Sequence, residues 1–243
     1  MKKLLFCSLL MLFPLNVLAD CLKGDCKNGY GIFEIEGHRY EGLWQDGKPH
    51  GFGKGTQANG NIVLVEFLAG RGEGFGTEIY PDGRVYVGEF SETKYNGFGT
   101  IKTPSGDTYS GQFVDGVPHG NGRLDFSDGG YFSGTFDQGQ IGPFGTLSIP
   151  DEMVYVGQLQ KERPHGTGSA TFANNTTYSG QWKHGDMHGK GVMKWPDGSI
   201  TLSTWVAGQP QGYGCETAPG GTQHICGDFE NGEIETKDKR PNQ

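Results

Sequence analysis

Four of the seven histidines recur at a regular spacing, which raises the question of a metal site. His50, His119, His165 and His188 are separated by multiples of 23 residues. Zinc needs ligand atoms about 2.1 Å away around one shared ion. Equivalent positions in stacked two-stranded units lie roughly 10 Å apart. We therefore expect no metal ladder, and we expect these histidines to stabilise turns through hydrogen bonds to nearby backbone.

Other residue types that could do chemistry lack suitable companions. The stretch from Gly185 to Lys190 resembles part of a phosphate-binding loop, but it is too short, and Gly191 follows where Ser or Thr is needed. The acid pair Asp151 and Glu152 falls where a turn is expected. We find no nucleophile with a paired base. The sequence therefore predicts a protein that is not an enzyme and uses no cofactor.

The cysteines suggest disulfides. Cys7 lies in the apolar N-terminal segment, and the other four form two groups near the ends of the chain, Cys21 with Cys26 and Cys215 with Cys226. Four cysteines in an exported chain imply disulfides, and three connectivities are open. We favour pairing within each group, which would clamp each terminus. A zinc site is the alternative, but neither pair has CxxC spacing.

The main signal in the sequence is an internal repeat of 23 residues, with units that start at 40, 63, 86, 109, 132, 155, 178 and 201. The first position is aromatic in six of the eight units, and the fourteenth is always glycine. The third is glycine in all units except the second and the eighth, and the fifth is aromatic in all except the sixth. In the second unit, Val63 and Val65 replace the aromatic residue and the glycine, a change that fits either sequence drift or a ligand groove. Asp-Gly or Asn-Gly often closes a unit, as at Asp82-Gly83.

This pattern resembles the MORN (membrane occupation and recognition nexus) repeat family, whose motif is Tyr-x-Gly-x-Trp/Phe-x-x-Gly-x-x-His-Gly-x-Gly. The stretch from Tyr178 to Gly191 matches it at every anchor, and the stretch from Tyr109 to Gly122 matches almost as well. The resemblance covers residues 40–224, about three quarters of the chain. It implies a non-enzymatic assembly platform, and the family's name also implies membrane association.

The physics of one unit predicts a β-hairpin. Positions one, three and five are aromatic, glycine and aromatic, and the positions between them are mostly polar, which is the alternation of a strand with one buried face. Asp-Gly and Asn-Gly are typical of tight hairpin turns. With 44 Gly and 12 Pro in 243 residues, a helical bundle is disfavoured. We therefore predict an all-β fold, an elongated twisted antiparallel sheet or open solenoid of stacked hairpins.

The recurring aromatic residues are the candidate binding face. A single sheet has little else to bury, so these rings could form only the core. They could also line a groove that is partly open and holds a peptide, a glycan or an amphipathic helix. The candidates are Tyr40, Trp44, Tyr86, Phe90, Tyr109, Phe113, Phe136, Tyr155, Tyr178, Trp182 and Trp205.

The ends of the chain set the expected domain boundaries. Residues 1–19 have the basic start, apolar stretch and small-residue site of a secretory signal peptide. A retained anchor or a lipoprotein signal is the alternative. We expect an N-terminal cap with a partial repeat over 20–39, eight repeats over 40–224, and a partial repeat, cap and polar tail over 225–243. The chain would then be exported, either to the periplasm or fully secreted.

The charge narrows the choice of partners. The net charge is −8, and removal of residues 1–19 takes away two lysines and leaves −10. This charge disfavours nucleic acid and anionic lipid. The leading hypothesis is a scaffold of the cell envelope or exterior that binds an unidentified protein along its repeat face. Weak association with a membrane surface and glycan or cell-wall binding are the alternatives, and a homo-oligomer stays open.

Overall fold

The computed structural model describes residues 21–221, 223–230 and 232–235. The expected signal peptide, and the end of the expected polar tail from residue 236, lie outside these residues. The described chain divides into two compact parts, which we call the first and the second unit; the 23-residue segments are called repeats. The first unit comprises residues 21–127 and 136–140, and the second comprises 128–135 and the described residues from 141 onward.

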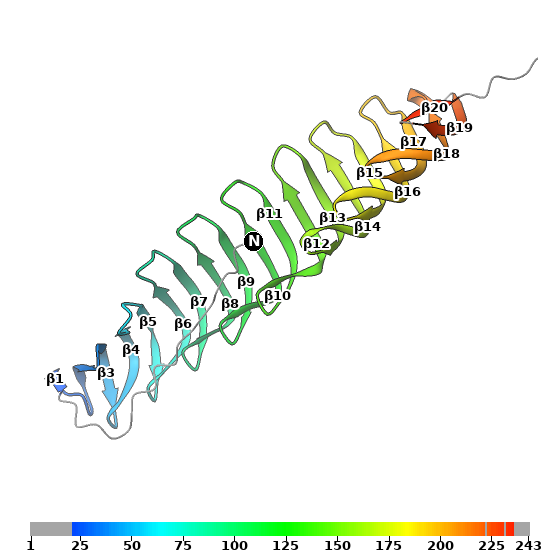
Figure 1. Ribbon diagram of the computed structural model, residues 1–243. Coiled ribbons are helices and arrows are strands. Elements are labelled where there is room, and N and C mark those ends of the chain that lie inside the picture. The colour runs from blue at the N-terminus through cyan, green and yellow to red at the C-terminus, as the bar shows by residue number, and fades with distance from the viewer. Residues whose placement is uncertain (1–20, 222, 231, 236–243) are drawn as a thin grey trace, which may run out of the picture. The chain divides into compact units, whose positions relative to one another are not determined.

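The first unit is a run of consecutive hairpins. From β1 to β10, consecutive strands pair antiparallel, and Figure 1 shows β3 to β9 side by side in chain order. The strands are β1 (Cys21–Gly24), β2 (Tyr30–Ile35), β3 (His38–Gln45), β4 (Lys48–Thr56), β5 (Ile62–Leu68), β6 (Arg71–Ile79), β7 (Val85–Ser91), β8 (Lys94–Lys102), β9 (Thr108–Val114) and β10 (Val117–Asp125).

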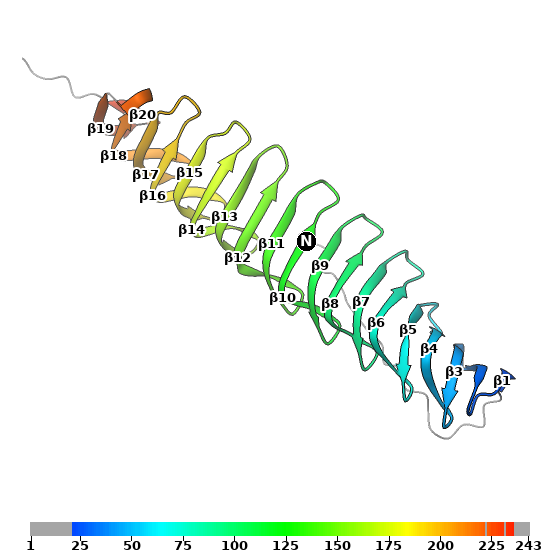
Figure 2. The same ribbon diagram turned by 180° about the vertical axis from the view of Figure 1, so that it is seen from behind.

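The second unit repeats this arrangement, and the boundary between the two units crosses β11 and the start of β12. From β12 to β20 each strand pairs antiparallel with the next, and Figure 2 shows the order of these strands from behind. The elements are β11 (Tyr131–Asp137), β12 (Gln140–Ile149), β13 (Met153–Gln160), β14 (Arg163–Phe172), β15 (Thr177–Lys183), β16 (Asp186–Lys194), β17 (Ile200–Val206), β18 (Gln209–Thr217), the short 3-10 turn η1 (Pro219–Gly221), β19 (His224–Glu230) and β20 (Glu233–Glu235).

Two kinds of turn alternate along the chain. Two-residue turns such as Asp115-Gly116 have positive φ at both residues, 50° and 87°. This is the geometry whose twist matches paired antiparallel strands. In the longer turns, such as the one at Asp82-Gly83, Tyr80 and Arg84 are joined by a backbone hydrogen bond of 2.9 Å. The turn signals in the sequence thus correspond to real chain reversals.

A bulge recurs inside the hairpins. In the pair β7–β8 the register shifts between Gly88 and Phe90, so that more residues of β8 than of β7 fill the gap. Gly97 lies in this gap with φ of 94°, a conformation that favours glycine. Similar shifts occur in β3–β4, β5–β6, β9–β10, β13–β14, β15–β16 and β17–β18. The bulge decides which side chain points outward at this point of each hairpin.

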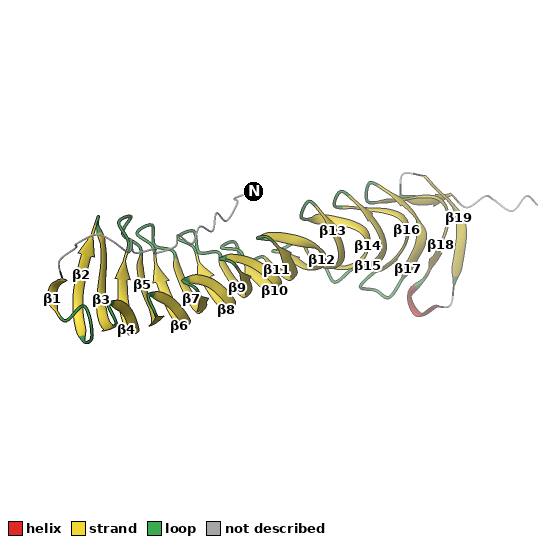
Figure 3. Ribbon diagram, turned by 90° about the horizontal axis from the view of Figure 1, so that it is seen from below, coloured by secondary structure: helices red, strands yellow, loops and turns green. Residues whose placement is uncertain are grey.

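The core of each unit consists of aromatic rings on one face of the sheet. The strands of the second unit are strongly bent (Figure 3), and rings of successive hairpins contact one another. The ring of Tyr178, for example, lies 5.2 Å from that of Trp182 and 5.4 Å from that of Trp205. The prediction of stacked antiparallel hairpins is confirmed. The described residues contain no α-helix, and their short 3-10 turn is neither long nor apolar enough to span a membrane.

Candidate interaction surface

The eleven aromatic residues singled out in the sequence are all buried, each with less than a tenth of its surface exposed. Burial raises the pKa of several of the tyrosines, including Tyr40 and Tyr155, to about 12. Of the two interpretations left open, the burial supports the one in which these rings form the core. A ligand would therefore meet other side chains first.

The packing of one tyrosine explains why the repeat needs its glycines. The hydroxyl of Tyr155 donates a hydrogen bond of 2.7 Å to the carbonyl oxygen of Gln158. Its ring lies against Gly157 and Gly168, and a Cβ atom added at either glycine would collide with that ring. These two glycines face each other across β13 and β14. The same arrangement of tyrosine and paired glycines recurs at Tyr86 and Tyr109.

The opposite face of the first unit carries a row of exposed phenylalanines. Phe52, Phe75 and Phe98 lie on β4, β6 and β8 at intervals of 23 residues. Their exposed fractions are 74%, 67% and 61%. Each follows a glycine with positive φ at the bulge, which turns the side chain away from the core. We refer to these three residues as the phenylalanine row. Aligned exposed apolar side chains of this kind mark interaction sites.

Two carboxylates lie between the rings of the phenylalanine row. Glu66 on β5 is directly opposite Phe52, and Glu89 on β7 is directly opposite Phe75. Glu89 also accepts a hydrogen bond of 3.0 Å from the backbone N–H of Phe98. Within the described part of the chain, neither glutamate forms a salt bridge. The row therefore presents rings and negative charges in alternation.

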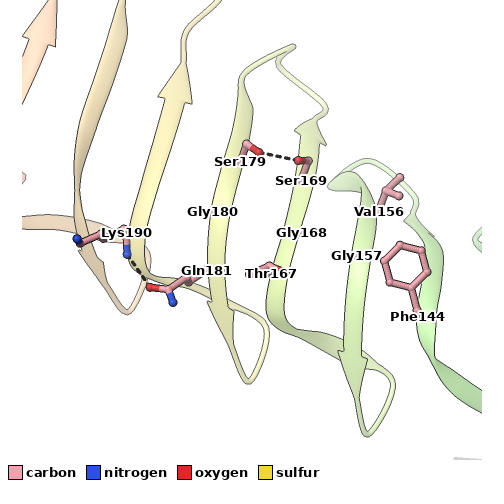
Figure 4. A pocket seen from close by; sticks show the side chains of 10 residues that line it. All are labelled: Phe144, Val156, Gly157, Thr167, Gly168, Ser169, Ser179, Gly180, Gln181 and Lys190. Carbon is pink, nitrogen blue, oxygen red and sulfur yellow. Dashed lines mark hydrogen bonds between the residues drawn. The ribbon is translucent and has the colours of Figure 1, made fainter.

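The equivalent face of the second unit contains a shallow hollow of about 480 Å³ that polar and apolar residues line together. Figure 4 shows Phe144 and Val156 at one side of it and Lys190 at the other. The hydroxyls of Ser169 and Ser179 lie 2.8 Å apart on its floor. This surface offers hydroxyl, amide and ammonium groups with an aromatic edge, and its chemistry differs from that of the phenylalanine row.

The sequence model of the MORN repeat family matches residues 40–62, 66–83, 86–108, 109–131, 155–177, 178–200 and 203–223. These segments make up more than half of the chain. The chain belongs to the MORN repeat family. Residues 132–154 lie between two matched segments and are not matched themselves. They still have the packing of a repeat, because the ring of Phe132 lies against Gly134 and Gly145 and leaves no room for a Cβ atom at either glycine.

Comparison with other known proteins adds two distant likenesses. No curated protein matches the chain at a significant level. Among solved structures, the TCP10 domain of Danio rerio CPAP is 16% identical, with a TM-score of 0.47, over 81% of this chain and 93% of that domain. The same domain in complex with a peptide of Danio rerio STIL is also 16% identical, with a TM-score of 0.46, over 86% and 96%. At this level of similarity the likenesses support no statement about function.

The second MORN repeat departs from the motif and contains a buried carboxyl group. Glu78, only 3% exposed, accepts hydrogen bonds from Asn61 Nδ2 at 3.0 Å and from the hydroxyl of Tyr95 at 2.6 Å. The Tyr80 hydroxyl is 2.5 Å from that of Tyr95. Burial raises the pKa of Glu78, while the donated hydrogen bonds oppose this shift. The cluster is closed to solvent, so we assign it to stability and not to ligand binding.

The histidines of the MORN repeats lie at the turn end of the hairpins. The backbone N–H of His184 donates to Nδ1 of His165 at 3.4 Å, and Nδ1 of His119 lies 3.6 Å from a carboxylate oxygen of Asp137. In the described residues, no group of three or more His, Cys, Asp or Glu is arranged to hold a metal ion. The contact at His165 is of the turn-stabilising kind that we expected.

The cysteines pair within each terminal group. The sulfur atoms of Cys21 and Cys26 lie 2.02 Å apart, and those of Cys215 and Cys226 lie 2.10 Å apart. The second pair joins residues directly opposite each other on β18 and β19. This is the local pairing that the sequence favoured.

Sequence reasoning missed the phenylalanine row, although a signal for it was present. Phe52, Phe75 and Phe98 each directly precede the glycine found in all eight units. Alternation predicts that the residue next to a buried position faces outward. An aromatic residue at an outward position in three successive repeats, where packing does not require it, could have been recognised from the sequence. The buried cluster around Glu78 has no such periodic signal.

Proposed function

We propose that this MORN repeat protein is a non-enzymatic scaffold that binds a protein partner through the outward face of its first unit. The observation that carries the proposal is the phenylalanine row, three rings that are mostly exposed and aligned on successive hairpins. Rings that stabilise nothing inside the protein are costly to expose to water unless a partner covers them.

We further propose that the protein acts in the cell envelope or outside the cell, with residues 1–19 as its signal peptide and residues 132–154 as a divergent repeat, the fifth of eight along the chain. The two disulfide pairs support an oxidising compartment, since such bonds are rare in a reducing cytosol. Fractionation of cells that produce the full chain tests the location. Recovery of the intact chain, with residues 1–19 still attached, only in the cytosol would contradict it.

The charges on this face favour a protein partner over a membrane. A membrane-binding surface combines aromatic side chains with lysine or arginine, which attract anionic headgroups. Here the groups between the rings are the carboxylates of Glu66 and Glu89. Placing them at an anionic bilayer would add repulsion and a cost of desolvation. The lipid alternative is therefore less well supported.

The proposal can be tested by cross-linking at the phenylalanine row in the cells that produce the protein. A photoreactive phenylalanine derivative at position 75 of the full chain should form an adduct with one discrete protein. The yield should fall at least fivefold when Phe52→Thr and Phe98→Thr are added. Phe144→Thr, an exposed phenylalanine at the same repeat position in the second unit, is the matched control and should leave the yield unchanged. Adducts with lipid alone, or with no protein, would overturn the proposal.

A second candidate function, glycan binding, is favoured by the hollow in the second unit. Hydroxyl and amide groups around an aromatic edge suit a sugar, whose hydroxyls need partners and whose C–H faces need an apolar surface. Titration of the full chain with soluble cell-wall fragments should then release heat that Ser179→Ala and Lys190→Gln diminish. Phe75→Thr should have no effect on it. No heat with any fragment would remove this candidate.

A further inference from the structure

The spacing of the phenylalanine row limits which chain conformations can lie on it. Phe52, Phe75 and Phe98 lie on every second strand, and neighbouring strands in a sheet are about 4.8 Å apart. Successive rings are therefore about 10 Å apart, and the whole row is about 20 Å long. A partner that touches all three rings must present contacts at this interval on one face.

Polyproline II matches this interval with the fewest residues. It repeats its faces every three residues, and three residues rise about 9.3 Å. A β-strand returns to the same face after an even number of residues, which gives about 6.6 or 13.2 Å. An α-helix needs seven residues for about 10.5 Å, so a helix of some 15 residues would touch each ring with only one side chain. A seven-residue polyproline II segment spans the same row.

The polar groups beside the rings also suit such a segment. Polyproline II has no internal backbone hydrogen bonds, so its carbonyl and N–H groups need partners when they are covered. Thr77 is on β6 two residues beyond Phe75, on the same outward face, and is partly exposed, so its hydroxyl would be within reach of the backbone of a segment on the row. A helix satisfies its own backbone and would gain nothing from this hydroxyl.

The charges on the face define the second property of the partner. Glu66 and Glu89 lie between the rings. Lys54, two residues beyond Phe52 on β4, is a positive charge on the same face, and it is opposite Glu41 on β3 and Leu64 on β5. A lysine or arginine of the partner would meet a carboxylate and a ring together. An arginine gains most, since its planar cation can stack on a ring and bind a carboxylate.

We propose that the phenylalanine row binds an extended basic segment of the partner protein in the polyproline II conformation. The segment has one apolar side chain at every third residue and arginine or lysine between them. This inference rests on the proposed function and names the chemistry of its partner.

Fluorescence anisotropy with the full chain and labelled synthetic peptides tests the inference. The probe is a twelve-residue peptide of four Leu-Pro-Arg units, because the residue before proline is held in the extended or polyproline II region. It should bind at least tenfold more tightly than four Leu-Pro-Glu units. It should also bind at least fivefold more tightly than a peptide of the same composition in shuffled order, or than a helical peptide with leucine at every seventh position.

Variants of the protein locate the binding. Phe75→Thr should weaken binding of the Leu-Pro-Arg peptide at least fivefold, and the matched control Phe144→Thr should leave it unchanged. The double variant Glu66→Gln with Glu89→Gln should weaken binding and reduce its dependence on salt. Thermal unfolding shows whether each variant is folded. Substitution of these exposed side chains should change the melting temperature little.

Three results would overturn the inference: equal binding of the shuffled or acidic peptide, tighter binding of the helical peptide, or equal losses in Phe75→Thr and Phe144→Thr. If the peptides fail while the cross-link at position 75 persists, the partner's chemistry is wrong and the scaffold function stands. If the cross-link is also absent, the scaffold function itself fails.

Discussion

Phe98 in the first unit and Lys190 in the second occupy the same place in their repeats, directly before a glycine that packs against a tyrosine ring. The backbone N–H of each donates to a side-chain oxygen on the preceding strand, Glu89 at 3.0 Å and Gln181 at 2.9 Å. The backbones are thus alike, while the exposed side chains are a phenylalanine and a lysine.

This comparison separates what the repeat requires from what it leaves free. The buried side of each hairpin is fixed, because the tyrosine ring fills the space that the paired glycines leave open. The outward side makes few contacts with the rest of the protein, so its residues can differ between hairpins without loss of fold. Differences in function between the two units should therefore come from the outward side.

Removal of the buried tyrosines tests whether the two units share the same buried packing, and it should have the largest effect on stability. Tyr109→Ala in the first unit and Tyr155→Ala in the second should each lower the free energy of unfolding by about 3–5 kcal/mol, since a fully buried aromatic ring is lost. Urea unfolding followed by tryptophan fluorescence measures both. A loss below about 1 kcal/mol in only one variant would show that the two units are not built alike.

Substitution of the glycines under these rings should have the next largest effect. A Cβ atom at Gly99 would collide with Tyr86, and one at Gly168 would collide with Tyr155. Gly99→Ala and Gly168→Ala should each lower the free energy of unfolding by about 1–3 kcal/mol through overpacking. Pairing each substitution with Tyr→Phe at its own tyrosine removes the hydroxyl and should recover part of the loss. No recovery would place the strain elsewhere.

These features show how far the sequence alone could lead. The hairpins, their order and the buried rings follow from alternation and from a 23-residue period, because local patterns decide both. The departures at Val63 and Val65 could be seen in the sequence but not explained. The structure shows that the side chain of Val65 lies against Gly76, where other repeats place a tyrosine ring. The buried Glu78 of the same repeat, in contrast, has a partner outside it. Tyr95 from the next repeat stacks on Tyr86 with ring centroids 3.6 Å apart and donates its hydroxyl to Glu78. Contacts of this kind depend on three-dimensional packing that a single repeat does not encode.

The outward surface was missed for a different reason. The rings at the first and fifth positions drew attention because they recur in most units, and recurrence in a repeat mainly reports the core. Phe75 and its equivalents recur only in part of the chain. In the second unit, Phe144 and Tyr213 are aromatic at this position, but Thr167 and Lys190 between them are not, so no run of three successive rings forms there. Partial recurrence at an outward position is the better signal for a surface with a role of its own.

The buried carboxyl group distinguishes the two units by their response to pH. Glu78 occupies the repeat position that holds Ala170 and Glu216 in the second unit, where Glu216 is exposed while Glu78 is buried. Burial raises its pKa in the folded state above the usual value of about 4.3. Below that value both states carry the proton. As the pH rises, the unfolded state loses its proton first, so the free energy of unfolding should fall until the pH passes the folded pKa.

Urea unfolding over a range of pH measures this effect. Glu78→Gln should remove the part of the fall that belongs to this group, because the amide does not titrate. Tyr95→Phe removes one of the hydrogen bonds that lower the pKa of Glu78, so the fall should continue to a higher pH. If Glu78→Gln and the original chain lose stability in parallel as the pH rises, the group is not ionising as described.

The outward side chains should show the smallest effects on stability, and their difference sharpens the comparison. Gln181 Oε1 accepts a hydrogen bond from the backbone N–H of Lys190. Gln181→Ala removes this hydrogen bond and should lower the free energy of unfolding by about 0.5–1 kcal/mol. Phe98→Thr removes a ring that is mostly exposed and should change it by less than about 0.5 kcal/mol in either direction.

Stability and binding should therefore separate at these two positions. Differential scanning fluorimetry of both variants measures the first property, and the peptide titration measures the second. Gln181→Ala should reduce the melting temperature and leave peptide binding intact. Phe98→Thr should weaken peptide binding and leave the melting temperature unchanged. If Phe98→Thr destabilises the protein as much as Gln181→Ala does, the ring contributes to the stability of the fold. Its exposure would then no longer indicate that the phenylalanine row binds a partner.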